Sequence, residues 1–374
     1  MTELKPKRVL LMYISQVSGH RQSAVAIQKS LKALNPDCEI MSINGFGYTY
    51  PLMEKIINTA YMGVIKRAPK IWEYLYDNPK IIKASQKIKQ KVHTSSHKKL
   101  QPLIDAFKPD VVICTQAFPC GMVADYKMTH RLPFIVIGVL TDFAPHLYWL
   151  HPGVDYYIVP SQEAKERYVN EGVAPDKIKV FGIPIRRKFA EKPDRAALMR
   201  KLGLAADVPT VLIMGGGQGL GPMKEAVKSL MRLSRPVQMI VIAGTNVKLV
   251  YWLKKMQRKT DKKIIFYDYA NNVDELMEVS TLIVSKPGGM TTCECLAKGL
   301  PMVIVDPIPG QEERNSQFLV NAGIAVRVDD KRRIGSAINA LLNDPKRLQA
   351  MREAALAHGK PKAADHIARF VLDL

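Results

Sequence analysis

The stretch "SKPGGMTTCECLAKGLP" occupies residues 285–301 and joins a buried strand to a helix. The apolar residues 281–284 before it indicate the end of the strand, and the residues after Thr291 have a helical pattern. Gly288 and Gly289 therefore fall at a strand-to-helix turn, where free backbone N–H groups attract an anion. Phosphate is the commonest biological anion, so this turn predicts a phosphate-containing ligand.

Apolar runs of strand length recur between helical patterns along the whole chain. They are "RVLLMYIS" (8–15), "DVVICTQ" (110–116), "PFIVIGVLTDF" (133–143), "YYIVPS" (156–161) and "IKVFGIP" (178–184), then "TVLIMGGG" (210–217), "QMIVIAG" (238–244), "KIIFYDY" (263–269), "TLIVSKPGG" (281–289) and "PMVIVDP" (301–307). Continuous Val/Ile/Leu runs indicate strands buried on both faces, as in a parallel sheet covered by helices. The sequence therefore predicts an α/β protein of two doubly wound domains.

The boundary between the domains is placed where the strand pattern stops and a charged, Pro-containing stretch intervenes, in residues 182–203. Residues 1–186 are predicted to form an N-terminal domain and residues 187–374 a C-terminal domain. We expect the last helix to pack back toward the N-terminal domain.

The composition is that of a globular protein, with 374 residues and 47% hydrophobic side chains. The formal net charge of +21 predicts attraction to a polyanion: nucleic acid, an anionic membrane surface or a phosphorylated substrate. The five cysteines lack zinc-site spacing, which favours core thiols in a reduced compartment. No apolar stretch approaches the roughly 20 residues that span a bilayer. We therefore expect a cytoplasmic protein whose membrane contact is peripheral.

Ligands of doubly wound domains bind beyond the carboxyl ends of the strands, so the loops there are the candidate site, in a cleft between the two domains. His20 follows the first strand and would take a proton from a hydroxyl near neutral pH, or would simply cap the next helix. Asp142 lies in the polar loop "TDFAPHLYW", where it either caps a turn or binds the acceptor. We assign His20 and Asp142 to the catalytic group.

The loop "GGGQGLG" (residues 215–221) lacks the G-x-G-x-x-G order of dinucleotide-binding turns, and no acidic residue ends the next strand. The loop therefore argues against NAD or FAD binding. Gly215, Gly216 and Gly217 either allow close helix packing or contact a phosphate or substrate, and both interpretations stay open.

Two further loops carry polar groups suited to a sugar nucleotide. Glu294 lies early in the helix after the phosphate turn, where it complements the helix dipole or accepts hydrogen bonds from vicinal ribose hydroxyls. Gln311 and Glu312 follow the next strand, with donors and acceptors that suit sugar hydroxyls.

Taken together, these segments resemble the GT-B glycosyltransferases of the family that includes bacterial diacylglycerol glucosyltransferases, plant-type monogalactosyldiacylglycerol synthases and the peptidoglycan N-acetylglucosaminyltransferase. The resemblance covers nearly the whole chain. It rests on "SGHRQSA", "TDFAPHLYW", "VFGIPI", "MGGGQGLGP", "PGGMTTCECLAKGLP" and "GQEERN", in that order.

The resemblance implies that the C-terminal domain holds a UDP-sugar. Glu294 would bind the uridine ribose, and the diphosphate would lie against Gly288, Gly289, Met290 and Thr291. The hexose would be bound by Gln311 and Glu312. The resemblance also makes His20 the acceptor-side base or an orienting group. A single glycine precedes His20, where the plant enzymes have several, and this favours glucose over galactose.

The expected reaction is an inverting transfer, in which negative charge grows on the departing diphosphate. Backbone donors at a helix start stabilise such charge without a metal. Since no Asp-x-Asp motif is present, we expect neither a metal nor another cofactor beyond the UDP-hexose donor.

The segment 48–101 holds 11 basic and 3 acidic residues, together with Trp72 and five tyrosines. Its helical pattern places isoleucines on one face and lysines on another, which is typical of a membrane-surface helix. Apolar residues lie just before this pattern: Leu52, Met53, Ile56, Ile57, Ala60 and Val64. We interpret the segment as the part that meets an anionic membrane and takes diacylglycerol from it.

Three alternatives remain at this point. A UDP-N-acetylglucosamine transferase acting on a lipid-linked peptidoglycan precursor shares the chemistry. A UDP-N-acetylglucosamine 2-epimerase shares the fold but needs no membrane-facing segment. A non-enzymatic nucleic-acid-binding protein would explain the charge but not Glu294 and Gln311, so we expect no nucleic-acid partner.

Overall fold

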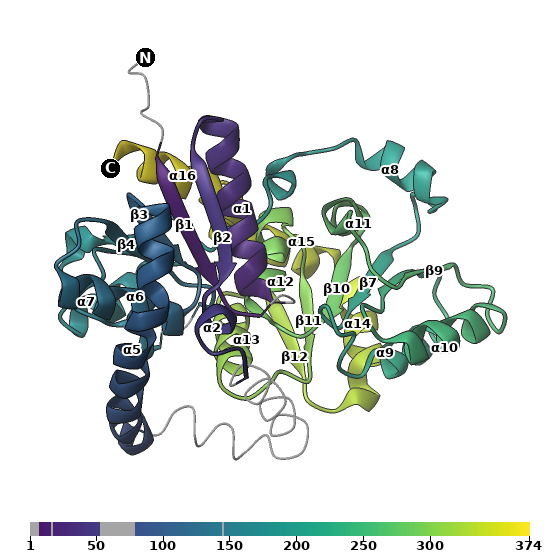
Figure 1. Cartoon of the computed structure of the whole chain (residues 1–374). Helices are drawn as coiled ribbons and strands as arrows, with labels where there is room; N and C mark the ends of the chain where they lie inside the picture. The colour runs from purple at the N-terminus through teal and green to yellow at the C-terminus, as the bar shows by residue number, and fades with distance from the viewer. Residues whose placement is uncertain (1–6, 16–17, 53–78, 144–145) are drawn as a thin grey trace. The chain divides into compact units, whose positions relative to one another are not determined.

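The computed structural model describes residues 7–15, 18–52, 79–143 and 146–374, with the side chains of residues 79–92 left aside. The chain divides into two compact units (Figure 1). The first unit comprises Met1–Arg187 and Lys362–Leu374, and the second comprises Lys188–Pro361.

The first unit is built on a sheet of six parallel strands in the order β2-β1-β3-β4-β5-β6. The strands are β1 (Arg8–Tyr13), β2 (Glu39–Asn44), β3 (Val111–Cys114), β4 (Ile135–Val139), β5 (Tyr156–Ile158) and β6 (Ile178–Lys179). The α-helices are α1 (Gly19–Leu34), α2 (Gly45–Thr49), α5 (Pro79–Phe107), α6 (Ala117–His130), α7 (Gln162–Asn170) and α16 (Ala363–Asp373).

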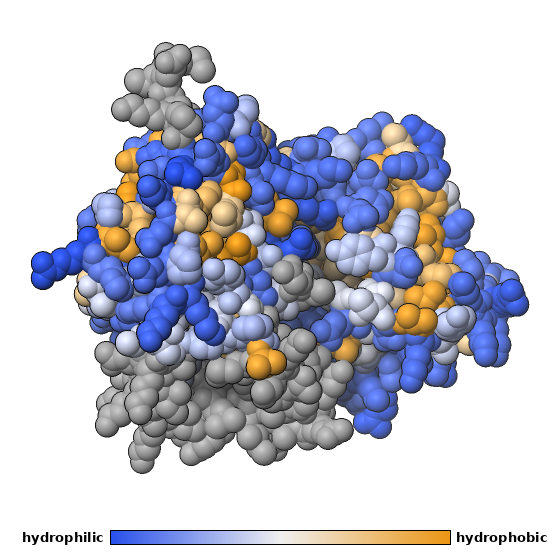
Figure 2. Space-filling model, viewed as in Figure 1, coloured by the Kyte–Doolittle hydropathy of each residue, from blue (hydrophilic) through white to orange (hydrophobic). Residues whose placement is uncertain are grey.

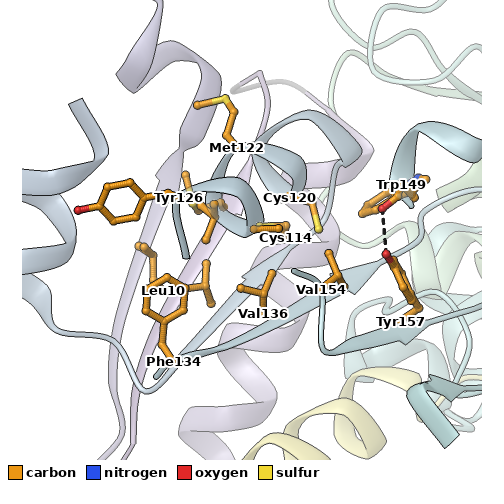
Figure 3. Close-up of a cluster of buried hydrophobic side chains, with 14 of the residues drawn as sticks. Leu10, Cys114, Cys120, Met122, Tyr126, Phe134, Val136, Trp149, Val154 and Tyr157 are labelled. Carbon is orange, nitrogen blue, oxygen red and sulfur yellow. Dashed lines mark hydrogen bonds between the residues drawn. The ribbon is translucent and has the colours of Figure 1, made fainter. Parts of the chain in front are cut away.

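Strand β1 shows why this sheet needs helices on both faces. Its successive side chains point to opposite faces, as in every strand. Leu10 and Met12 pack in one core cluster with residues of α5 and α6, part of which is drawn in Figure 3. Val9 and Leu11 pack in another cluster with α1 and with Ile367 of the C-terminal helix α16. The last helix of the chain is therefore part of the first unit.

The second unit is built on a parallel sheet in the order β12-β11-β10-β7-β8-β9. The strands are β7 (Thr210–Met214), β8 (Gln238–Ile242), β9 (Ile264–Tyr267), β10 (Leu282–Ser285), β11 (Met302–Val305) and β12 (Ala325–Val328). The α-helices are α8 (Arg195–Leu202), α9 (Met223–Met231), α10 (Val247–Gln257), α11 (Val273–Val279), α12 (Gly289–Lys298), α13 (Gln311–Asn321), α14 (Ile334–Leu342) and α15 (Pro345–His358).

Both sheets are doubly wound, and each has one point where the strand order reverses. The reversal lies between β1 and β3 in the first sheet and between β7 and β10 in the second. In such folds ligands bind outside the carboxyl ends of the strands at this switch point. Helix α1, which carries His20 in its first turn, follows β1, and the loop that carries Gly288 follows β10, so both residues lie at a switch point.

The structure corrects the sequence interpretation at one helix and adds two strands. Helix α12 begins at Gly289 rather than near Thr291, so Gly289, Met290 and Thr291 form its first turn. Strands β2 and β12 were not predicted, and both lie at sheet edges, where residues are partly exposed and the apolar run is broken.

The basic segment is described only in part. Helix α5 is present from Pro79 to Phe107, but the predicted faces of its first half lie outside the described side chains. Of the apolar residues expected before it, only Leu52 is described, and it is exposed. The remainder, with Trp72, lie outside the described residues.

Candidate active site

The turn between β1 and α1 places His20 at the start of a helix. Ser18 is the N-cap of α1, and its hydroxyl oxygen accepts a hydrogen bond from the Arg21 backbone N–H at 3.2 Å. The same hydroxyl lies 2.6 Å from the Ile14 carbonyl oxygen, to which it donates. Ser18 therefore ties the end of the strand to the first turn of the helix, and His20 is held in that turn.

The His20 ring is fixed by two threonines of neighbouring loops. Its Nδ1 atom lies 2.9 Å from the carbonyl oxygen of Thr115 and 2.9 Å from Oγ1 of Thr141. The Thr115 hydroxyl in turn donates to the His20 carbonyl oxygen at 2.9 Å. Because a carbonyl oxygen only accepts, Nδ1 must carry the proton in the neutral ring. The lone pair of the neutral imidazole is then on Nε2.

The environment of the ring keeps it neutral. Burial of the ring lowers the pKa of His20 from 6.5 to about 4, and the hydrogen bond to the Thr115 carbonyl opposes this shift only in part. Desolvation disfavours the charged imidazolium, which explains the direction. His20 is therefore an unprotonated base at physiological pH, with Nε2 as the basic atom.

The structure places Asp142 directly after Thr141, partly buried, in the loop that follows β4. The two described partners of His20 Nδ1 are threonines, which sequence reasoning missed. Each threonine closely follows a buried strand, at the carboxyl edge where His20 also lies, and this was the available signal. The catalytic role predicted for Asp142 stays a prediction.

Two described residues of the "TDFAPHLYW" loop are part of the core. Trp149 and His146 are buried, and the Tyr157 hydroxyl donates to the Trp149 carbonyl oxygen at 3.3 Å, as drawn in Figure 3. Tyr157 also accepts from the His151 backbone N–H at 2.9 Å. These contacts hold the described end of the loop in place, while Thr141 at its start contacts the ring of His20.

In the second unit, two glycines of the loop after β7, Gly215 and Gly219, are required for close backbone packing. A Cβ atom at Gly215 would lie 2.3 Å from the Leu220 carbonyl oxygen, and one at Gly219 would lie 1.9 Å from the Ala243 carbonyl oxygen. Gly216 has a φ of +66°, and nothing lies within 4 Å of where its Cβ would be. Gly217 accepts a hydrogen bond from the Thr245 backbone N–H at 3.0 Å. Packing therefore explains Gly215, whereas Gly216 borders open space.

The loop after β10 ends at Gly288, which is the N-cap of α12. The first turn of a helix directs its N–H groups outward and carries the positive end of the helix dipole. That turn consists of Gly289, Met290 and Thr291, and Glu294 follows in the second turn, partly buried. The arrangement suits an anion in front of the turn, with Glu294 one turn away from it.

Residues of α13 hold this loop from the other side. The buried Asn315 side chain donates to the Pro287 carbonyl oxygen at 3.0 Å. Glu312 accepts from the Ile308 backbone N–H at 2.7 Å through Oε2, and a Cβ atom at Gly288 would lie 3.6 Å from its Oε1. The first turns of α12 and α13 are therefore neighbours, and both Gln311 and Glu312 lie in the first turn of α13.

Lys286 is a cation at this site that sequence reasoning missed, although it directly precedes the "PGG" motif. Its Nζ forms an ion pair with Oδ2 of Asp306 at 3.3 Å, and its side chain is 13% exposed, against 63% for Asp306. A Cβ atom at Gly221 would lie 3.4 Å from Lys286 Cε. Lys286 therefore joins the loops that follow β7, β10 and β11, at the switch point of the second sheet.

Two findings concern what the described residues do not contain. Among them, no group of three His, Cys, Asp or Glu side chains is placed to hold a metal ion. Within the same ranges, no helix combines the length and the hydropathy that crossing a membrane requires.

Two doubly wound units of this topology, with a neutral histidine at one switch point and a helix N-terminus at the other, define the class of GT-B glycosyltransferases. Residues 20–185 match the family described as monogalactosyldiacylglycerol (MGDG) synthase, and residues 210–367 match the glycosyltransferase family 28 C-terminal domain. The chain is 31% identical over 370 residues to a processive diacylglycerol beta-glucosyltransferase of Bacillus cereus (strain AH187), covering 99% of this chain and 94% of that protein. It is 30% identical, with the same coverage, to the Bacillus mycoides (strain KBAB4) protein of that description. The chain therefore belongs to the diacylglycerol glucosyltransferase and monogalactosyldiacylglycerol synthase family.

Solved structures confirm the fold. MurG of Acinetobacter baumannii superposes with a TM-score of 0.68 at 18% identity, covering 99% of this chain and all (100%) of MurG. The UDP-GlcNAc 2-epimerase of Neisseria meningitidis, bound to UDP-GlcNAc, gives a TM-score of 0.61 at 14% identity, covering 98% of this chain and 100% of the epimerase. These identities are low, so the two structures support the GT-B architecture alone.

Proposed function

We propose that this protein transfers glucose from UDP-glucose to diacylglycerol, with inversion at the anomeric carbon, and so makes a glycolipid. The observation that carries the proposal is the 30–31% identity to diacylglycerol beta-glucosyltransferases over 99% of the chain. The peptidoglycan transferase and the 2-epimerase, in contrast, resemble this chain at 18% and 14% identity and share the fold. The alternatives are therefore not favoured.

The chemistry follows from the two sites. Nε2 of His20 accepts the proton of the diacylglycerol hydroxyl as its oxygen bonds to the anomeric carbon of glucose. The bond from that carbon to the diphosphate oxygen breaks at the same time, and UDP leaves with the electron pair. The first turn of α12 and the Lys286 ammonium would stabilise the charge that grows on the diphosphate. The glycosidic bond formed is β because the donor is α-linked.

The remaining residues take binding roles in this proposal. Glu294 accepts hydrogen bonds from the uridine ribose, and Gln311 contacts the hexose. Glu312 contributes to the hexose site and also holds the loop at Ile308. Gly216, which borders open space, lets a substrate group approach the backbone of the β7 loop. Asp142 acts beside His20 on the acceptor side.

We further propose that the reaction needs no metal ion, since the α12 dipole and Lys286 supply positive charge where a metal would. Assays with and without EDTA test this proposal. Equal rates are the expected outcome, and a loss of activity that Mg²⁺ or Mn²⁺ restores would contradict it.

The protein is also proposed to work at the cytoplasmic face of the cell membrane as a peripheral protein. The lipid acceptor and the basic segment 48–101 support this location. We propose that the net charge of +21 attracts the protein to anionic lipid rather than to nucleic acid.

The deciding experiment is incubation of the protein with labelled UDP-glucose, UDP-galactose or UDP-N-acetylglucosamine and diacylglycerol in mixed micelles, followed by lipid extraction. We expect label in the lipid phase with UDP-glucose only. Transfer from UDP-galactose would move the protein to the galactolipid branch. Transfer only to a lipid-linked peptidoglycan precursor, or epimerisation of the nucleotide sugar without transfer, would overturn the proposal.

A further inference from the structure

Helix α10 of the second unit has one exposed face that combines basic and hydrophobic side chains. Val247 and Tyr251 are 63% and 65% exposed, although both are large and hydrophobic. The other exposed residues of this face are Lys248, Lys254, Lys255 and Arg258. Their spacing, with steps of one, three and four residues, keeps them on one side of a helix. Residues 247–258 contain no acidic residue.

The opposite face of α10 is fixed in the core. Leu249 and Leu253 are fully or almost fully buried, and they pack in the same cluster as Val241 and Ile264 of the sheet. The helix therefore cannot turn to bury Val247 and Tyr251 without losing these contacts. Its exposed face is a permanent feature of the second unit.

Helix α9 extends the basic surface. Lys224 and Lys228, one turn apart, place their ammonium groups 5.7 Å and 5.9 Å from the ring centroid of Trp252 on α10. Both lysines are exposed, as is Arg232 at the end of α9. The acidic residue of α9, Glu225, lies 3.5 Å from Lys331 in an ion pair. In Figure 2, hydrophobic and strongly hydrophilic colours lie side by side on the second unit.

We propose that the exposed face of α10, together with the basic row of α9, is a binding surface for an anionic lipid bilayer. The surface is defined by Lys224, Lys228, Arg232, Val247, Lys248, Tyr251, Lys254, Lys255 and Arg258. The inference deepens the proposed function, and it rests on that function for the choice of a membrane. It assigns membrane contact to the donor-binding unit as well as to the basic segment of the first unit.

The exposed apolar residues of this surface favour a bilayer over nucleic acid. Each basic residue close to an anionic membrane contributes about 1 kcal/mol of attraction, and this surface has seven of them. Phosphate contacts in nucleic acid would use the same charges, but would gain nothing from an exposed valine. An amphipathic side chain such as tyrosine, beside an aliphatic one, suits the boundary between headgroups and acyl chains.

The first test measures flotation of the full-length protein with vesicles of phosphatidylcholine, with or without phosphatidylglycerol. In the variant Lys254→Glu/Lys255→Glu, we expect partition onto the anionic vesicles to fall at least about tenfold. The matched control is Lys346→Glu/Arg347→Glu, which reverses two exposed charges on α15 of the same unit and should change partition little. Equal partition of both variants, or an equal loss in both, would overturn the proposal.

The second test asks whether the face enters the lipid. The five native cysteines are buried, so an environment-sensitive dye on Tyr251→Cys reports from this position. We expect a blue shift with anionic vesicles, and none for the same dye on Gln349→Cys of the exposed α15 surface. No shift at either position would contradict insertion. If the variant Lys254→Glu/Lys255→Glu lost binding to DNA but kept binding to vesicles, the face would be assigned to nucleic acid.

Activity in detergent micelles separates this inference from the proposed function. The α10 variant should transfer glucose to micellar diacylglycerol at the wild-type rate, because the surface lies outside the proposed chemistry. A different result is possible, in which the wild-type protein transfers no glucose but the variant Lys254→Glu/Lys255→Glu still floats less than wild type. In that case the proposed function fails and the membrane surface stands.

Discussion

His20 and Thr115 are joined by two hydrogen bonds that run in opposite directions, each 2.9 Å long. The His20 ring donates from Nδ1 to the Thr115 carbonyl oxygen, and the Thr115 hydroxyl donates to the His20 carbonyl oxygen. The two residues are 95 positions apart, and they meet because β1 and β3 are neighbours at the switch point of the first sheet. This pairing assigns the proton to Nδ1 and leaves the lone pair of the neutral ring on Nε2.

The first prediction separates a catalytic base from an orienting group. His20→Asn keeps a donor near the Nδ1 position but has no basic nitrogen, whereas His20→Ala has neither. If Nε2 is the base, both variants should lose 10²- to 10⁴-fold in kcat, as expected for general base catalysis, with unchanged affinity for UDP. Near-normal turnover in His20→Asn together with an inactive His20→Ala would show that the ring only orients.

Thr141 is predicted to act as a positioning residue for the ring. Thr141→Val removes the oxygen that lies 2.9 Å from Nδ1 and keeps the shape of the side chain. We expect kcat to fall about tenfold, with KM for UDP-glucose unchanged, because the ring orientation is less well defined. Thr141→Ser, which restores the hydroxyl, should recover most of the rate. A valine variant as fast as wild type would remove Thr141 from this role.

The low pKa of His20 predicts the acid limb of the pH profile. The base is active when neutral, so kcat/KM should stay constant from neutral pH down to about pH 5 and decline below the pKa of about 4. Micellar diacylglycerol as acceptor keeps membrane binding out of the measurement. A midpoint near the ordinary histidine pKa of 6.5 would contradict the burial of the ring.

The same pKa shift predicts a loss of stability in acid. The folded protein holds the pKa at about 4, below the value of 6.5 for a free histidine, so the unfolded chain binds the proton more readily. The contribution of His20 to the free energy of unfolding is therefore present above pH 6.5 and is lost as the pH falls toward 4. Denaturant titrations at several pH values should show a smaller acid-dependent loss in His20→Asn than in wild type.

The sequence indicated where the two sites lie, because buried parallel strands leave continuous apolar runs that end where the ligand-binding loops begin. The positions of His20 and Gly288 at strand ends were predictable for this reason. Edge strands such as β2 and β12 have one neighbour and partly exposed residues, so their runs are broken and no strand was predicted there.

The partners of the site residues were not predictable, since they depend on tertiary contacts. Thr115 and Thr141 reach His20 only through the order of the strands in the sheet. Lys286 lies beside the glycine turn in the sequence. Its ion pair with Asp306, in the loop after β11, depends on the tertiary structure and was not predictable. The start of α12 was misplaced by two residues because Gly289 is a poor helix former, and the tertiary setting overrides that preference.

Lys286 is predicted to bind the diphosphate. Lys286→Met removes the ammonium and keeps the length of the side chain. Hydrogen bonds to charged groups contribute about 1.5–3 kcal/mol, so we expect the Kd for UDP to rise about tenfold or more. Asp306→Asn is the matched control, because it breaks the 3.3 Å ion pair and leaves the lysine in place. Calorimetry should show UDP binding as tight as wild type, or tighter, in Asp306→Asn. Equal affinity of Lys286→Met and wild type would exclude the contact.

The last prediction concerns Glu294 and the ribose. If its carboxylate accepts hydrogen bonds from the ribose hydroxyls, wild-type protein should bind UDP about tenfold more tightly than 2′-deoxy-UDP, since loss of one hydroxyl leaves the carboxylate with one partner fewer. Glu294→Ala should weaken UDP binding and abolish this preference, because the partner of the hydroxyl is gone. Calorimetric titration of both proteins with both nucleotides gives a double-mutant cycle. The cycle yields the coupling free energy between the carboxylate and the hydroxyl. A preference for UDP that persists in Glu294→Ala would assign the ribose to another residue.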